Sequence, residues 1–304
     1  MEPSDGLTAA NRALDARDSQ GALAAIAPLL ANHADVPAVQ WTAGRYFGLH
    51  QAYAEAAAQF KLAVQGNPAL SYVEFDVAGR VVRLRDIPGS PWAADVLDEF
   101  ARKMYGITEL AFAPGDVALD IGAHIGGVSV VLALLQPDIR IVSYEPSSSN
   151  FAMLCANLEE NGITNVTPVQ QAVMGERGEL TLTWSPQATA GSTVGLSEGS
   201  RLAREAAGWS SETVQCVTLD DVFATHAIER CSWLKLDCES AEWGIAARTG
   251  VLDRIDRISM ELHLPWSRQA QGLERCVEEF VALIRRVPQA PPVLFSSTVW
   301  MMDV

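Results

Sequence analysis

Apolar residues along this chain follow one spacing before residue 70 and another after it. Up to about residue 68, small and apolar residues recur every three to four positions, as on one face of an amphipathic helix. From residue 71, short apolar runs of strand length alternate with further helical patterns. The chain is therefore predicted to form a small all-α domain over residues 1–70 and an α/β domain over residues 71–304.

The helical segment contains a weak internal repeat with a period of about 34 residues. Its second half carries small and aromatic residues at the offsets of the tetratricopeptide consensus: Gly44, Phe47, Ala56, Phe60, Ala63 and Pro68. The segment thus resembles two tetratricopeptide hairpins, in which small residues mark the points where paired helices come close. Two hairpins are fewer than a free-standing array normally needs. We expect them to pack on the following domain or on a second copy of the chain, with peptide binding as the alternative.

The alternation of apolar runs with helical patterns continues to the end of the chain. Residues 72–77 and 80–84 indicate a β-hairpin, and residues 91–105 a helix. Further apolar runs are predicted strands, at residues 117–120, 139–144, 166–169, 180–184, 215–219, 233–236 and 255–262. Residues 292–303 can supply one or two closing strands. Strands separated by helices predict a mostly parallel sheet with helices on both faces.

A glycine turn followed by a second acid is the most informative feature of the sequence. The predicted strand at residues 117–120 leads into the letters D-I-G-A-H-I-G-G, residues 120–127, and a helical pattern follows. The next predicted strand ends in Glu145 and Pro146. An acid about 20 residues past such a turn is placed to accept hydrogen bonds from a ribose diol. The chain is therefore predicted to bind an adenosine-containing cofactor.

The spacing of the glycines separates the possible cofactors. A dinucleotide fingerprint carries its glycines as G-x-G-x-x-G, which brings a pyrophosphate onto a helix N-terminus. Here Gly122, Gly126 and Gly127 follow Asp120. The carboxylate of Asp120 would repel a pyrophosphate, but it suits the ammonium and sulfonium of S-adenosyl-L-methionine. The alternative is that Asp120 only caps the turn and that the glycines only make it tight.

Composition and charge narrow the range of partners. The formal net charge is -15 and the sequence pI is about 4.7, which disfavours nucleic acid as a substrate because its phosphates would be repelled. The five cysteines include no C-x-x-C pair, which predicts reduced thiols. The first residues lack the pattern of a signal peptide, and no apolar run reaches transmembrane length. These features predict a soluble, cytoplasmic protein with no membrane partner.

Motifs in a fixed order connect the second part of the chain with a known family. They are F-A-P-G-D and the turn at 112–127, Y-E-P at 144–146, V-T-L-D-D at 217–221, L-K-L-D-C-E-S-A-E at 234–242 and M-E-L-H at 260–263. Together they resemble the FkbM-type family of S-adenosylmethionine-dependent methyltransferases. The resemblance covers roughly residues 71–304. It departs from the family pattern at His124, where asparagine is usual, and at Ser240, where glycine is usual.

The resemblance implies a Rossmann-like class I methyltransferase fold. Such enzymes convert S-adenosyl-L-methionine to S-adenosyl-L-homocysteine, usually methylating a hydroxyl of a sugar, glycan or natural product, and transfer to nitrogen is a close variant. The residues expected to bind the cofactor are Asp120, Gly122, Ala123, His124 and Gly126 for the methionine half, Glu145 for the ribose, and Pro146, Gln171 and Ala172 beside the adenine. Residues 191–193 correspond to a serine-rich substrate loop of related enzymes.

Polar residues after two later strands are the candidates for catalysis. Asp237, Glu239 and His263 are expected to meet the others at the carboxyl edge of the sheet and to take the proton of an acceptor alcohol. The alternative for His263 is a hydrogen-bonded structural role. Glu242 is expected to cap its helix or pair on the surface, and Lys235 to pair with a carboxylate or touch the substrate. The close acids could hold a divalent cation, although their spacing does not demand one and none is predicted.

Two other classes of function compete with methyl transfer. A nicotinamide oxidoreductase on the same sheet is opposed by the glycine spacing. A non-catalytic module, in which the N-terminal helices recruit a partner, is opposed by the presence of Asp120, Glu145, Asp237 and Glu239. The expected partners are a small-molecule or glycan acceptor and, through the N-terminal helices, a second copy of the chain.

Overall fold

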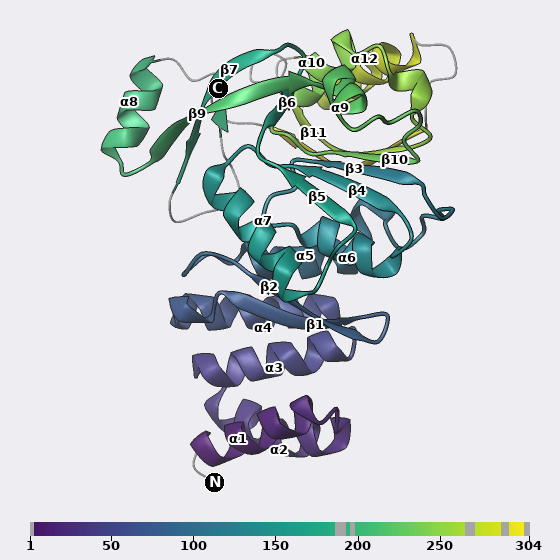
Figure 1. Cartoon of the computed structure of the whole chain (residues 1–304). Helices are drawn as coiled ribbons and strands as arrows, with labels where there is room; N and C mark the ends of the chain where they lie inside the picture. Colours follow the sequence, from purple (N-terminus) through teal and green to yellow (C-terminus); the bar gives the residue numbers. More distant parts are fainter. Residues whose placement is uncertain (1–2, 186–192, 195–197, 265–270, 287–291, 301–304) are drawn as a thin grey trace. The chain divides into compact units, whose positions relative to one another are not determined.

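The computed structural model describes residues 3–185, 193–194, 198–264, 271–286 and 292–300 (Figure 1). The chain divides into two compact units, Met1–Lys103 with Glu159–Asn161, and Met104–Leu158 with Gly162–Val304. The first unit keeps the predicted hairpin together with the helices that precede it. The predicted division after residue 70 coincides with the change from helix to strand, and as a domain boundary it stays a prediction.

Helices and one hairpin build the first unit. They are α1 Pro3–Asp15, α2 Ser19–His33, α3 Pro37–Leu49, α4 Tyr53–Gly66, β1 Tyr72–Val77, β2 Arg80–Arg85 and α5 Trp92–Ala101. Small residues let two helices come close, because a Cβ at Gly44 of α3 would lie 2.8 Å from the ring of Phe60 in α4. Arg45 of α3 is buried and pairs with Glu74 of β1 at 2.6 Å. The predicted helical segment is confirmed, and a buried ion pair ties it to the hairpin.

A six-stranded parallel sheet forms the centre of the second unit, in the order β12-β11-β10-β3-β4-β5. Its strands are β3 Val117–Ile121, β4 Arg140–Tyr144, β5 Val166–Val169, β10 Trp233–Leu236, β11 Ile258–Leu264 and β12 Val293–Trp300. The chain passes outward from β3 to β4 and β5, and later enters β10 on the other side of β3. The order thus reverses between β3 and β10, where sheets of this kind bind ligands at the carboxyl ends of their strands. The predicted Rossmann-like sheet is confirmed.

Helices cover both faces of this sheet (Figure 1). They are α6 Gly127–Leu135 and α7 Ser148–Glu160 on one face, and α9 Leu219–Thr225, α10 Ala241–Arg248 and α12 Leu273–Arg285 on the other. Alternate strand residues, Leu119 and Leu234 among them, enter one apolar core with Ile245 of α10 and Phe280 of α12. The removal of this apolar surface from water drives the packing of the layers.

Two of the predicted strands do not join the parallel sheet. β7 Gly178–Trp184 and β9 Ser210–Thr218 pair antiparallel, in a second sheet with β6 Ala172–Met174 and β8 Thr193–Val194, and α8 Glu198–Ala206 precedes β9. The connections from β5 to β6 and from β6 to β7 are too short for the crossover that a parallel neighbour needs. Residues 191–192 of the expected substrate loop, and residues 301–303 of the expected closing strands, lie outside the described residues.

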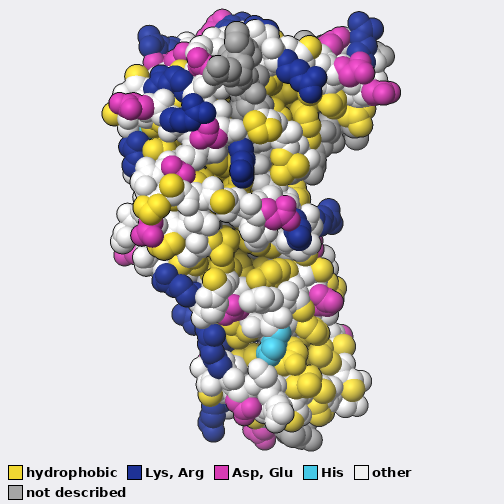
Figure 2. All heavy atoms as spheres, turned by 90° about the vertical axis from the view of Figure 1, so that its right-hand side faces the viewer, with side chains coloured by type: hydrophobic (Ala, Val, Ile, Leu, Met, Phe, Trp, Pro, Cys, Tyr) yellow, Lys and Arg dark blue, Asp and Glu magenta, His cyan; other side chains and the backbone are white. Residues whose placement is uncertain are grey.

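The surface shows both signs of charge. Figure 2 draws one face, on which basic and acidic side chains are interspersed among hydrophobic ones. Two leucines of the helical unit are exposed, Leu23 by 48% and Leu62 by 44%. Among the described residues, no helix combines the length and the hydropathy needed to cross a membrane.

Candidate active site

The glycine turn follows β3 and packs against the end of β10. The backbone N–H groups of Gly122 and Ala123 donate to the carbonyl of Tyr144, at 3.0 and 2.9 Å. Gly122 has a φ of 79°, and a Cβ there would lie 1.7 Å from the carbonyl oxygen of Asp237. Both the left-handed backbone and the lack of space require glycine. The turn therefore holds the segments after β3, β4 and β10 together at one edge of the sheet.

Asp120 lies directly beneath this turn and is completely buried. Its Oδ1 accepts from Lys235 Nζ at 3.0 Å, and its Oδ2 accepts from Ser129 Oγ at 2.6 Å. Lys235 Nζ also donates to the carbonyl of Gly122 at 2.7 Å. Lys235 thus pairs with a carboxylate, one of the two roles expected for it. The predicted contact of Asp120 with the methionine half of the cofactor stays a prediction.

Glu145 follows β4 and is held beside the same turn. Its Oε2 accepts from the backbone N–H of His124 at 2.8 Å. Its Oε1 accepts from the backbone N–H of Ser147 at 3.0 Å and from Asn150 Nδ2 at 3.3 Å. Burial raises the pKa of the Glu145 carboxyl to about 7, against these hydrogen bonds, which favour the ionised form. A fixed carboxylate thus lies one strand away from Asp120.

The remaining residues expected to bind the cofactor lie close in sequence to the ends of β4 and β5. Pro146 comes directly after Glu145 and is half-buried. Gln171 is half-buried between β5 and β6, while Ala172 is buried and opens β6, where it pairs with Cys216 of β9. Their expected place beside an adenine ring stays a prediction.

A second group of acids follows β10. Asp237 Oδ2 accepts from the hydroxyl of Tyr105 at 2.9 Å and lies 3.6 Å from Lys235 Nζ. Glu239 and Ser240 both have left-handed backbones, with φ of 53° and 81°, before α10 begins. Ser240 therefore occupies a conformation that favours glycine, the usual residue of the related family at this position. Tyr105 was not singled out from the sequence, since 132 residues separate it from its partner.

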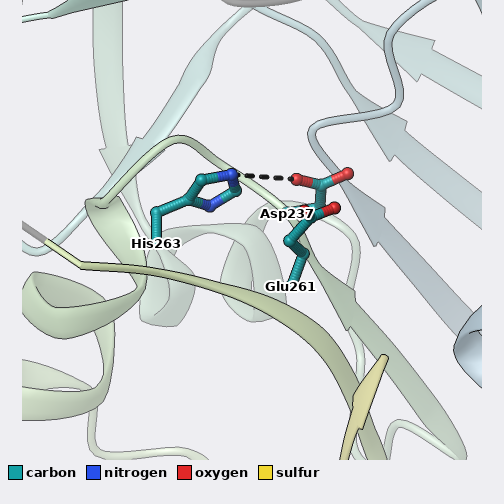
Figure 3. Close-up of side chains that lie close together, drawn as sticks. All are labelled: Asp237, Glu261 and His263. Atoms are coloured by element: carbon teal, nitrogen blue, oxygen red, sulfur yellow. Dashed lines mark ion pairs between the residues drawn. The ribbon is translucent and has the colours of Figure 1, made fainter. Parts of the chain in front are cut away.

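His263 of β11 points toward Asp237 (Figure 3). Its Nε2 lies 3.7 Å from Glu239 Oε2 and 4.0 Å from Asp237 Oδ1. Its Nδ1 lies 3.0 Å from Glu242 Oε1. The three predicted catalytic residues, Asp237, Glu239 and His263, are therefore brought together from two neighbouring strands.

The expectation that Glu242 lies on the surface is wrong. Its side chain is completely buried and accepts from the backbone N–H of Cys238 at 2.9 Å, in addition to its contact with His263. Both contacts are made by Oε1 and offset part of the cost of burial, whereas Oε2 has no hydrogen bond among the described residues. The contact with the N–H of Cys238 agrees with the other expectation for Glu242, that it caps the helix α10.

The acids and His263 influence one another's protonation. Burial raises the pKa of Glu239 to about 7; nearby acids, Asp237 first, add to this, and His263 opposes it. For His263, burial alone would lower the pKa, but the carboxylates of Glu242, Glu239 and Asp237 outweigh it and raise the pKa to about 10. The edge of the sheet therefore carries groups that can hold or exchange a proton.

Comparison with known proteins agrees with the motifs. The family model described as "Methyltransferase FkbM domain" matches residues 120–289. The 31-O-demethyl-FK506 methyltransferase FkbM of Streptomyces tacrolimicus is 29% identical over 195 residues, which are 57% of this chain and 72% of that protein. Methyltransferase sdnD of Sordaria araneosa is 27% identical over 165 residues, 47% of this chain and 63% of that protein, slightly less than two thirds of its length.

Solved structures are similar only in part. The crystal structure of M. jannaschii TYW2 in complex with AdoMet matches with 18% identity and a TM-score of 0.26, over 38% of this chain and 65% of that one. A score this low does not by itself establish a shared fold.

Proposed function

We propose that this chain, which belongs to the methyltransferase FkbM domain family, methylates a hydroxyl oxygen of a sugar, glycan or other natural product. The family model covers more than half of the chain, and the chain is therefore an S-adenosylmethionine-dependent methyltransferase. The relative from Streptomyces carries a demethylated natural product in its name, which supports a small-molecule acceptor. The observation that carries the proposal most directly is the carboxylate of Glu145, fixed beside the glycine turn by the N–H of His124.

The residues at the sheet edge fit the cofactor chemically. Glu145 offers a carboxylate for a ribose diol, and Pro146, Gln171 and Ala172 lie nearby in sequence for the adenine. The turn from Gly122 to Gly126 would hold the methionine half. When bound, S-adenosyl-L-methionine supplies an electrophilic methyl group, and the protein's part is to bind and orient it against the acceptor.

Asp120 supports the turn from below. Both of its carboxylate oxygens accept hydrogen bonds, from Ser129 and Lys235. The ammonium of Lys235 also donates to the carbonyl of Gly122 in the turn. We infer that Asp120 acts on the cofactor through Lys235 and the backbone of the turn, because its side chain is completely buried.

The acceptor hydroxyl must lose its proton during methyl transfer. Asp237, Glu239 and His263 are the proposed catalytic residues. The side chain of Glu239 is 30% exposed and that of His263 only 5%, so Glu239 is the more accessible proton acceptor. Asp237, which accepts a hydrogen bond from Tyr105, and His263 would orient Glu239 and the acceptor.

An amine acceptor is the second candidate. The acids around His263 would also attract a positively charged substrate. The proposed partner proteins are limited to a second copy of the chain, bound through the N-terminal helices, and the proposed compartment is the cytoplasm.

Calorimetry and mass spectrometry test this function. The full chain should bind S-adenosyl-L-homocysteine, and NAD should give no measurable heat. Replacing Glu145 by Gln should weaken binding about 10- to 100-fold, because a charged hydrogen-bond acceptor is lost. The exposed Glu274→Gln serves as a control that leaves affinity unchanged.

Incubation with S-adenosyl-L-methionine and panels of hydroxylated or amine metabolites should then give a product heavier by one methyl group. Preference for NAD, or an affinity unaffected by Glu145→Gln, would reject the assigned cofactor site. A methylated amine and no methylated alcohol would favour the second candidate.

A further inference from the structure

Three possible metal ligands converge where β10 ends beside β11. One ligand atom each from Asp237, Glu261 and His263 lie within 4.8 Å of one another, and Figure 3 shows the three side chains turned toward a shared space. Residues two apart on a strand face the same side. Glu261 and His263 are two apart on β11, so both can face Asp237, which follows the neighbouring parallel strand.

His263 is arranged like a metal-binding histidine. Its side chain is 5% exposed, and Nδ1 lies 3.0 Å from the completely buried carboxylate of Glu242. A histidine that binds a metal usually donates its other ring N–H to a carboxylate, which fixes the tautomer and the ring orientation. With Nδ1 donating to Glu242, Nε2 faces the acids, and a metal ion bound there would displace the proton of Nε2.

Nε2 of His263 faces two carboxylates at ion-pair distance. The neighbouring acidic oxygens, of Glu239 and Asp237, lie 3.7 and 4.0 Å away, beyond hydrogen-bonding distance. An ion bound to both Nε2 and a carboxylate oxygen would bridge this spacing.

Lys235 and Tyr105 engage only one carboxylate oxygen of Asp237. Lys235 is already bonded to Asp120 and to the carbonyl of Gly122. It lies 3.6 Å from Oδ2 of Asp237, the oxygen that also accepts from Tyr105. The other oxygen, Oδ1, is the one that faces His263. A cation in the shared space would therefore meet an oxygen that Lys235 and Tyr105 leave available.

We propose that Asp237, Glu261 and His263 bind a divalent metal ion through two carboxylate oxygens and Nε2. Mixed nitrogen and oxygen ligands suit a first-row ion such as Mn²⁺. Three protein ligands leave positions for an acceptor oxygen, whose proton the ion makes easier to remove, with Glu239 beside it to take that proton. This role rests on the proposed function, whereas binding of the ion does not.

Binding of Mn²⁺ alone tests the site. The full chain, freed of metal with a chelator, is titrated with Mn²⁺ and followed by electron paramagnetic resonance, without cofactor or acceptor. We expect saturable binding of a single ion per chain. Glu261→Gln, at a partly exposed ligand, should weaken it more than about tenfold, and Glu242→Gln by about 10- to 100-fold through the orientation of His263.

The exposed Glu274→Gln is the matched control and should bind Mn²⁺ like the unmodified protein. Circular dichroism confirms that each variant is folded, and the Glu261 variant decides the outcome if the buried Glu242 variant does not fold. The absence of saturable Mn²⁺ binding, or equal affinity after Glu261→Gln, would overturn the proposal. Binding of S-adenosyl-L-homocysteine, measured on the same samples, shows separately whether the cofactor site itself is correct.

Discussion

Three acidic side chains at the sheet edge are buried, and each has a specific partner. Asp120 pairs with Lys235, Glu242 with His263, and Glu145 accepts from backbone N–H groups. A buried charge costs several kcal/mol unless it is paired or hydrogen-bonded. At the scale of single residues, the site is therefore a set of charges whose positions are fixed before any ligand arrives.

Glu145 should make cofactor binding depend on pH. Burial raises the pKa of its carboxyl to about 7, and only the ionised carboxylate can accept from a ribose diol with both oxygens. We expect the affinity for S-adenosyl-L-homocysteine to be constant above about pH 8 and to fall about tenfold per pH unit below about pH 6. Calorimetric titrations across this range measure the change, and a flat profile would contradict the role of Glu145.

The stability of the free protein should respond in the opposite direction. The folded carboxyl has a pKa of about 7 and the ordinary value is 4.5, so the folded state binds more protons between these values. The contribution of Glu145 to the free energy of unfolding should therefore fall as the pH rises from about 4.5 to about 7. Glu145→Gln should lack this component when the two proteins are compared by urea unfolding.

At the scale of elements, β3 and β10 are joined at two levels. Below the edge, Asp120 and Lys235 form a buried ion pair between register neighbours. At the edge, Gly122 lies against the carbonyl of Asp237. These strands are separated in sequence by more than one hundred residues, so the pair and the close contact hold together the two halves of the sheet.

Removing one partner of this pair should destabilise the fold. Lys235→Met leaves the carboxylate of Asp120 buried without its cation, and we expect a loss of about 3–5 kcal/mol in the free energy of unfolding. The double variant Asp120→Asn with Lys235→Met leaves no buried charge and should lose less. Urea unfolding of both variants measures the difference, and a double variant less stable than the single one would show that the pairing account is incorrect.

At the scale of the whole molecule, the helical unit is the part through which we propose that two copies of the chain associate. Leu23 of α2 and Leu62 of α4 are both more than 40% exposed, so they are positions at which the proposed dimer can be tested. The compact unit that contains these helices also includes the β1–β2 hairpin and α5. The predicted boundary at residue 70 lies within this unit, where helix changes to strand, and stays a prediction.

The proposed homodimer can be tested by light scattering during gel filtration of the full chain. We expect twice the mass of the chain, and a shift to the monomer after Leu23→Glu or Leu62→Glu, since a charge replaces an apolar contact. The matched control is Leu202→Glu, at an exposed leucine of α8 in the other unit, which should leave the mass unchanged. A monomeric parent protein would refute the dimer.

Local patterns predicted most of the elements. β3, the glycine turn and α6 are consecutive in the chain, so apolar spacing and the glycines were sufficient to place them. β7 and β9 were predicted as strands, but their sheet was not, because the choice of partner depends on connection length and packing. The approach of Asp237, Glu239 and His263 was predicted because parallel strands present their carboxyl ends at one edge.

By itself, the sequence determined the helical segment, the order of strands and helices, the acid–glycine turn and the family of methyltransferases. Tertiary structure alone decided that Lys235 pairs with Asp120, that Tyr105 donates a hydrogen bond to Asp237, and that Glu242 is buried against His263. The physical reason is distance along the chain. Periodicity reports which face of an element is buried, whereas the partner of a buried charge is chosen by which strands lie side by side.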